Sequence, residues 1–188
     1  MAERALYIPV ILGTVRKGRL SANAARLMTD ELSKRPAVET ELIDIATLQL
    51  RTDDAGEAIK DPNFAARMDR ADALVIVSPE YNHGYSGMLK HVLDSCLQEY
   101  IHKAVGIAGV SAGRYGGTRG IQDLLPVMRE LGLVTIFWDA NFSHAHKLFG
   151  SEGKPLDNSL LPLIDKFLKE LIWMARTLRY GRESISLD

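Results

Sequence analysis

The residues best suited to chemistry in this chain follow the apolar run 73–77. Seven consecutive positions there combine a rigid proline, a carboxylate, a phenol ring, an amide and an imidazole. A buried strand needs no such turn, whereas an aromatic ring beside polar groups can stack on a flat ligand and bond its edge. The sequence therefore predicts a binding loop for a flat, polar-edged ligand. Its candidate residues are Pro79, Glu80, Tyr81, Asn82, His83 and Gly84.

A second group of residues, after the apolar run 6–12, is typical of a phosphate site. No acidic residue stands between Arg4 and Asp30, although several cations do. Backbone amides at a helix N-terminus attract an anion, and a local excess of positive charge strengthens that attraction. The alternative is a solvated basic turn. The candidate phosphate ligands are Thr14, Arg16, Arg19, Ser21 and Asn23.

Two nucleotide-binding motifs can be compared with this loop. The spacing from Gly13 to Gly18 fits a P-loop, but Arg19 and Leu20 replace the Lys-Ser/Thr pair that would hold phosphate and magnesium. In the dinucleotide fingerprint, Val15 stands where the second glycine lets a pyrophosphate approach. The sequence therefore disfavours NTP hydrolysis and indicates a site for a terminal phosphate.

A third polar loop follows the apolar run 104–110. Its glycine-rich backbone can bond polar ring edges, and its tyrosine can line a flat ring together with Pro79 and Tyr81. A phosphate at one loop and a ring across two others suit a mononucleotide with a tricyclic ring, which is FMN. The candidates on this loop are Ser111, Gly113, Arg114, Tyr115 and Gly116.

The chain resembles the NADPH-dependent FMN reductase family, which includes quinone, azo-dye and chromate reductases. Two motifs carry the resemblance, Gly-Ser/Thr-x-Arg and Pro-Glu-Tyr-Asn…Gly-x-Leu-Lys…Asp. They match Gly13-Thr14-Val15-Arg16, Pro79-Glu80-Tyr81-Asn82, Gly87-Met88-Leu89-Lys90 and Asp94. The chain departs from the usual family pattern at Gly84, Ser86 and His91.

The resemblance implies an FMN-dependent NAD(P)H oxidoreductase. Hydride passes from NADPH or NADH to the flavin, and electrons then pass to quinones, free flavin or related small-molecule acceptors in ping-pong fashion. It also implies that backbone amides at 82–84 and 113–116 bond the flavin ring, that Arg114 helps hold a phosphate of the nicotinamide donor, and that the chain forms a homodimer or homotetramer. No protein side chain is expected to be catalytic, because the flavin carries the chemistry.

Several conspicuous side chains have a second interpretation. Glu80 is expected to pair with Lys90 or with an arginine of a second subunit rather than to act in catalysis. His83 is a candidate substrate contact. His144 and His146 lack further ligands nearby, so we expect no metal site and place them on a surface loop.

The elements that must position these loops alternate between apolar strands and amphipathic helices. This rhythm predicts a single α/β domain, a doubly wound, flavodoxin-like three-layer sandwich with a five-stranded parallel sheet in the order 2-1-3-4-5. The expected strands are 6–12, 38–45, 73–77, 104–110 and 133–138. The first expected helix has Ser21 as its N-cap and ends before Pro36, and Asp61-Pro62 indicates the cap and first turn of the second, which ends near Arg70. The other expected helices cover 87–100, about 118–131 and 160–180, and the stretch 47–60 is expected to be irregular.

The composition sets outer limits on function. The chain has 188 residues and a net charge of −1, which gives no electrostatic reason to expect nucleic acid or an anionic membrane as partner. The single Cys96 excludes an intramolecular disulfide, and with no expected signal peptide or membrane span we predict a cytoplasmic protein. The rival hypothesis is a flavodoxin-like electron carrier or flavin-binding regulator, but such carriers usually present an acidic surface.

Overall fold

Two fully buried strands form the centre of the molecule. The computed structural model describes residues 4–51 and 60–187. Within it, β5 (Ala73–Pro79) and β6 (Ala104–Val110) pair in parallel over their whole length. Both are runs of apolar residues, as expected for strands covered on both faces. Their carboxyl ends therefore reach the same edge of the sheet, where Pro79 lies beside Val110.

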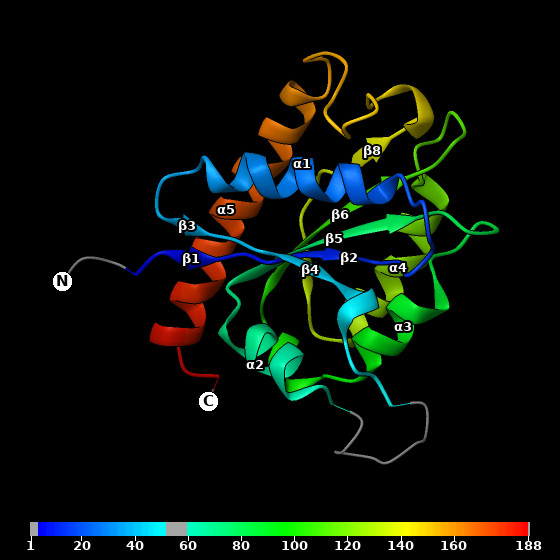
Figure 1. Ribbon diagram of the computed structural model, residues 1–188. Helices are drawn as coiled ribbons and strands as arrows, with labels where there is room; N and C mark the ends of the chain where they lie inside the picture. Colours follow the sequence, from blue (N-terminus) through cyan, green and yellow to red (C-terminus); the bar gives the residue numbers. More distant parts are fainter. Residues whose placement is uncertain (1–3, 52–59, 188) are drawn as a thin grey trace.

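The remaining elements alternate along the chain as the sequence predicts (Figure 1). The other strands are β1 (Leu6–Tyr7), β2 (Val10–Leu12), β3 (Val38–Glu39), β4 (Leu42–Asp44), β7 (Val134–Thr135) and β8 (Ala140–Phe142). The helices are α1 (Ser21–Ser33), α2 (Pro62–Arg70), α3 (Gly87–Asp94), α4 (Thr118–Glu130) and α5 (Leu161–Ser184). Short 3-10 turns cover Ile45–Thr47, Gln98–Tyr100 and Ala145–Lys147.

The sheet is parallel, but the prediction of one five-stranded sheet in the order 2-1-3-4-5 is correct only in part. A six-stranded sheet runs β4-β2-β5-β6-β7, with β8 also paired to β6, and β1 and β3 form a separate pair. Two predicted strands, 6–12 and 38–45, are each divided in two. Pro9 divides the first because it has no N–H to donate to a neighbouring strand. The fifth, expected at 133–138, is replaced by β7 and β8.

Helices cover both faces of the sheet, so the two cores are separated by it. One core holds residues of α1 and α5, and the other holds residues of α2, α3 and α4. Figure 1 shows α1 on one side of the strands and α2 and α3 on the other. Gly106 permits the close approach of α5, because a Cβ there would lie 2.3 Å from Cζ of Phe167.

Some predicted helix boundaries are wrong for local reasons. The helix expected at 87–100 ends at Asp94, where the Ser95 hydroxyl donates to the Val92 carbonyl and competes with the helical bonds. Asp61 caps α2 as the sequence indicates, accepting from the Phe64 amide at 2.9 Å. The last helix continues to Ser184, and residues 52–59 of the predicted irregular stretch lie outside the described residues.

No helix in the described ranges is both long enough and apolar enough to span a membrane. Cys96 is buried, and that burial raises the pKa of its thiol to about 11. The thiol therefore packs as a small apolar group at neutral pH.

Candidate functional site

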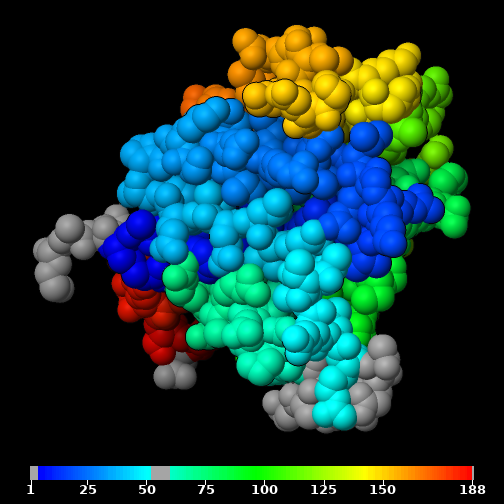
Figure 2. Space-filling model, viewed as in Figure 1, coloured from blue at the N-terminus to red at the C-terminus, as the bar shows by residue number. Residues whose placement is uncertain are grey.

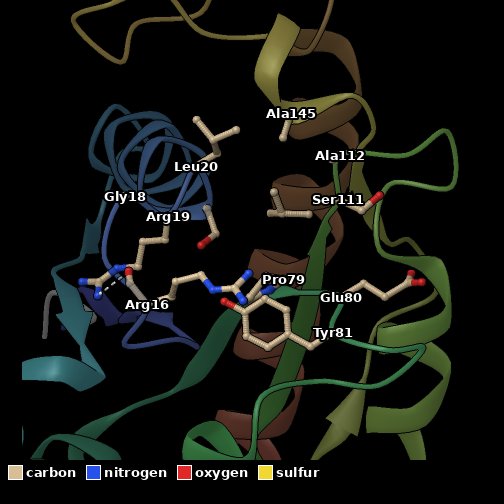
Figure 3. Close-up of a pocket in the computed structure, with 12 residues that line it drawn as sticks. Arg16, Gly18, Arg19, Leu20, Pro79, Glu80, Tyr81, Ser111, Ala112 and Ala145 are labelled. Atoms are coloured by element: carbon tan, nitrogen blue, oxygen red, sulfur yellow. Dashed lines mark hydrogen bonds between the residues drawn. The ribbon is translucent and has the colours of Figure 1, made fainter.

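Three loops meet at the carboxyl edge of the sheet and enclose a pocket of about 270 Å³. They follow β2, β5 and β6, which are neighbours in the sheet. A ligand site is expected at this edge of a doubly wound sheet. The pocket is lined by Arg16, Gly18, Arg19, Leu20, Ser21, Pro79, Glu80, Tyr81, Val110, Ser111, Ala112 and Ala145 (Figure 3).

The loop after β2 and the loop after β5 are bonded to each other inside the pocket wall. The buried Thr14 hydroxyl and the Tyr81 phenol oxygen are 2.8 Å apart, and the Arg16 amide donates to the same Thr14 oxygen at 3.3 Å. The Arg16 guanidinium lies over the Tyr81 ring, 4.8 Å from its centre. Figure 3 shows these two side chains together on the floor of the pocket. A cation over a phenol ring is favourable, so each side chain orients the other.

Ser21 does not cap α1 as the sequence suggested. It is the first residue of the helix, and Leu20 occupies the N-cap position without a side-chain bond. The Ser21 side chain is only 2% exposed, and among the described residues its hydroxyl has no hydrogen-bond partner. A buried hydroxyl without a partner is costly, and at a helix N-terminus it lies beside amides that favour an anion.

Arg19 lines the pocket, but its charge is directed elsewhere. Its guanidinium forms an ion pair with Asp44 at the end of β4. Figure 3 shows the Arg19 side chain extending away from Tyr81. The sequence interval without acidic residues did not reveal this pair, because Asp44 comes from a different strand of the sheet.

The motif after β5 forms a tight two-residue turn. The Tyr81 and Gly84 backbones exchange hydrogen bonds at 2.8 and 2.9 Å. Asn82 and His83 between them have φ angles of 50° and 71°, the geometry of a type I′ turn. Asn tolerates this region readily, whereas His is less common there. Both side chains stand exposed at the tip of the turn.

Ser86 fastens this motif to the phosphate loop. Its buried hydroxyl donates to the Gly13 carbonyl at 2.7 Å and accepts from the Leu89 amide at 3.1 Å. The same oxygen therefore caps α3 and ties the N-terminus of that helix to the first residue after β2. Ser86 is one of the positions where the chain departs from the usual family pattern, and sequence reasoning assigned it no role.

Glu80 has a structural partner that the sequence did not predict. Its carboxylate points away from Arg16 (Figure 3), and one oxygen lies 3.8 Å from the Arg119 guanidinium of α4. The expected pairing with Lys90 is wrong, because Lys90 binds Asp94 on its own helix. The second Glu80 oxygen is buried and has no hydrogen-bond partner in the described part of the chain.

The fourth wall of the pocket comes from the segment after β8. Ala145 donates its amide to the Ser111 carbonyl at 3.0 Å, and the His144 amide donates to the Gly113 carbonyl at 3.1 Å. Ala145 points into the pocket in Figure 3. The only sequence signal for this wall was its position after a strand, because alanine carries no functional group.

Comparison with known proteins identifies the family. The model of the NADPH-dependent FMN reductase family matches residues 6–147. The chain belongs to this family. It is therefore an FMN-dependent NAD(P)H oxidoreductase, as the resemblance of its two loop motifs implied, and the hypothesis of a carrier without turnover is not favoured.

Individual relatives agree with the family. The NAD(P)H-dependent FMN reductase PA1204 of Pseudomonas aeruginosa is 30% identical over 175 residues, covering 88% of this chain and 94% of that protein. A quinone reductase of Pseudomonas putida is 29% identical over 171 residues, covering 86% and 90%.

Solved structures establish the flavodoxin-like fold. FerB, an NAD(P)H:acceptor oxidoreductase of Paracoccus denitrificans, superposes with a TM-score of 0.74 at 22% identity, covering 90% of this chain and 99% of that one. A short-chain flavodoxin gives 0.60 at 20% identity, with the same coverage.

The residues of the pocket fit the FMN of this family. The Ser21 hydroxyl, which has no hydrogen-bond partner within 4–51 and 60–187, suits a phosphate together with the N-terminus of α1 and Arg16. The side chains of Pro79 and Tyr81 line the pocket and provide a surface for the flavin ring. Of the predicted residues, the pocket brings together Arg16, Arg19, Ser21, Pro79, Glu80, Tyr81 and Ser111.

Other predicted ligands of the family's cofactor lie outside the pocket lining. The Thr14 hydroxyl is bonded to Tyr81. Asn23 accepts from Arg26 and packs against Gly153, whose segment lies on α1 in Figure 2. The remaining predicted residues beyond the lining are Asn82, His83, Gly84, Gly113, Arg114, Tyr115 and Gly116. Lining residues that the sequence did not suggest are Gly18, Leu20, Val110, Ala112 and Ala145.

His144 and His146 lie close together, with ring centres 6.2 Å apart. Across residues 4–51 and 60–187, no group of three or more His, Cys, Asp or Glu side chains is arranged to hold a metal ion.

Proposed function

We propose that FMN binds in this pocket with its phosphate at the loop after β2 and its ring against the loops after β5 and β6. Ser21 carries the proposal, because its buried hydroxyl lacks a partner among the described residues and lines the pocket beside Arg16. A phosphate oxygen there would accept from the hydroxyl, from backbone amides and from the guanidinium. Arg16 then leaves the Tyr81 ring, which becomes available to the flavin.

The protein's own part in the reaction is binding and orientation. Bound FMN supplies the hydride acceptor and the electron donor. Tyr81, held by Thr14, would fix one wall. The backbone amides of Asn82 and His83 and those of 113–116, next in sequence to lining residues, would donate to the polar edge of the ring, whereas the Gly84 amide is used within the turn. Such donors would favour negative charge at that edge of the bound cofactor. No protein nucleophile or metal is required.

We further propose that nicotinamide donor and acceptor use the same open face in turn. Alternate use of one site gives ping-pong kinetics. The acceptors are quinones, free flavin or related flat oxidants, a proposal supported by the family and by a relative that is named a quinone reductase. Initial rates at several fixed quinone concentrations would give parallel double-reciprocal lines. Intersecting lines would contradict the alternation.

The decisive experiment is anaerobic reduction of the purified protein. After loading with FMN, its visible flavin absorbance is expected to bleach within the dead time of manual mixing with NADPH and to return on adding a quinone. Flavin that stays oxidised would contradict the reductase function, and failure to take up FMN would contradict the site.

Ser21 can be tested separately from overall folding. Ser21→Ala is expected to weaken FMN binding by about tenfold, because one charge-assisted hydrogen bond is lost. Ser33→Ala is the matched control, since Ser33 ends the same helix, and is exposed. Flavin fluorescence titration measures both, and equal affinities for FMN would remove Ser21 from the phosphate site.

We also propose that the chain works as a homodimer or homotetramer in the cytoplasm. Exposed Met88 and Leu97 on and just after α3 provide apolar surface for such an interface. Light scattering of the purified protein measures the assembly, and a monomeric mass at micromolar concentration would contradict it.

A further inference from the structure

Two arginines line the pocket, and they are held in different ways. The Arg19 guanidinium forms an ion pair with Asp44, which fixes its position. Within residues 4–51 and 60–187, the Arg16 guanidinium forms no ion pair and no hydrogen bond. It rests on the Tyr81 ring, with its central carbon 4.8 Å from the ring centre. Of the two arginines, Arg16 is therefore the one whose side chain is free to change position.

The Tyr81 ring beneath this guanidinium is held in place. Its phenol oxygen lies 2.8 Å from the buried Thr14 hydroxyl, and its backbone exchanges two hydrogen bonds with Gly84. Figure 3 shows the Arg16 guanidinium against the Tyr81 ring at the floor of the pocket. Because both side chains line the same pocket, a ligand ring that packs on Tyr81 competes with the guanidinium for the same surface.

A second position for the Arg16 guanidinium lies near the N-terminus of α1. Ser21 in the same pocket is 2% exposed, and its hydroxyl has no partner in the described part of the chain. An anion bound there would form a charge-assisted contact with a guanidinium, which is stronger than the contact of a cation with an exposed ring. Arg19 is already paired with Asp44, so such an anion would draw Arg16 away from the ring.

We infer that Arg16 covers the ring-binding surface of Tyr81 until an anion occupies the N-terminus of α1, and that it thereby discriminates against flavins that lack a phosphate. A flavin without phosphate must displace the guanidinium unaided, which lowers its affinity by about two- to fivefold. FMN carries its own anion and avoids this loss. Anion binding at one end of the pocket and ring binding at the other are thus positively coupled, and the coupling is reciprocal. The inference rests on the proposed FMN site.

Lumiflavin, which has the flavin ring without the ribityl phosphate, tests the inference without catalysis. Its fluorescence is titrated with the flavin-free protein, as wild type and as Arg16→Ala. We expect Arg16→Ala to bind lumiflavin about two- to fivefold more tightly, although the same variant loses affinity for FMN. An arginine that serves only as a phosphate ligand would leave lumiflavin affinity unchanged, and that result would overturn the inference. Lys17→Ala makes the same charge change outside the pocket lining and is expected to bind lumiflavin as the wild type does.

Inorganic phosphate gives a second measurement of the same coupling. Lumiflavin is titrated in sodium chloride and in sodium phosphate at equal ionic strength. Phosphate is expected to raise the affinity of the wild type for lumiflavin towards that of Arg16→Ala and to leave the variant unchanged. Equal affinities of the wild type in the two salts would overturn the inference. If the wild type takes up no FMN, the proposed site fails and the inference fails with it. If it takes up FMN but binds lumiflavin as tightly as Arg16→Ala does, the inference alone fails.

Discussion

The Thr14 hydroxyl and the Tyr81 phenol oxygen are 2.8 Å apart, and this contact joins the loops after β2 and β5 across the floor of the pocket. Both loops follow neighbouring parallel strands, so the contact joins residues 67 positions apart in sequence. Since Arg16 stacks on the same tyrosine ring, the bond also fixes the position of the guanidinium.

Tyr81→Phe keeps the ring but removes this hydrogen bond. The buried Thr14 hydroxyl loses a partner, so we expect the free energy of unfolding to fall by about 1 kcal/mol and FMN affinity to fall several-fold. Urea denaturation and flavin fluorescence measure the two effects. Tyr180→Phe, at an exposed position of α5, is the control. Unchanged FMN affinity in Tyr81→Phe would show that the bond does not shape the site.

Arg16→Ala removes the guanidinium from the phosphate loop. We expect FMN affinity to fall by about ten- to hundredfold, because a charge-assisted contact with the phosphate is lost. The neighbouring Lys17→Ala makes the same charge change outside the pocket lining and is expected to have little effect. If the two variants bind FMN equally well, general positive charge and not Arg16 attracts the phosphate.

Ser86→Ala removes both hydrogen bonds of its hydroxyl, to Gly13 and to the amide of Leu89. Loss of the helix cap and the loop tether is expected to lower the free energy of unfolding by about 1–2 kcal/mol. Thermal and urea denaturation measure the change. The exposed Ser151→Ala serves as control. A variant as stable as the wild type would mean that α3 is capped equally well without Ser86.

Lys103 gives stability a defined pH dependence. Its buried amine donates to the Met68 and Asp69 carbonyls at the end of α2, and desolvation lowers its pKa to about 8. Between about pH 8 and the usual value near 10.5, the unfolded chain holds more protons, so this group makes stability rise with pH. Below pH 8 its destabilising contribution is constant.

The difference between wild type and Lys103→Met isolates this effect. Cys96, whose pKa is raised to about 11, contributes in the opposite direction above about pH 9, but it titrates in both proteins. Above pH 8, we expect the free energy of unfolding of the wild type to rise relative to that of the variant by up to about 1.4 kcal/mol per pH unit. Urea denaturation at pH 7, 8, 9 and 10 measures it. A constant difference across this range would contradict the lowered pKa.

Asp72 anchors the opposite end of the sheet. Its side chain is 0% exposed and accepts two bonds of 2.8 Å from Arg4 and one of 2.9 Å from the Tyr7 amide. Asp72→Asn removes the buried carboxylate that Arg4, Arg179 and Arg182 all face, and we expect a loss of about 3 kcal/mol in the free energy of unfolding. Asp157→Asn, in an exposed loop, is the control. Since Asp72 is remote from the pocket lining, FMN affinity of the folded variant is expected to stay unchanged.

The sequence by itself determined the parallel α/β architecture, the family and three of the walls of the pocket. These depend on local signals: apolar runs of strand length, helix periodicity, and polar motifs placed directly after strands. It could not indicate where strands divide or where α3 ends, because these boundaries depend on single hydrogen-bonding groups. Pro9 lacks an amide N–H where the first strand divides, and the Ser95 hydroxyl binds a helix carbonyl where α3 ends.

Only the tertiary structure decided how side chains from different loops pair. Arg19 is held by Asp44, Glu80 by Arg119, and Ala145 closes the pocket from a segment far along the chain. Such contacts depend on distance in space, which the order of residues does not encode locally. For the same reason the motif after β5 divides its roles: Tyr81 lines the pocket, whereas Asn82 and His83 form the exposed tip of its turn.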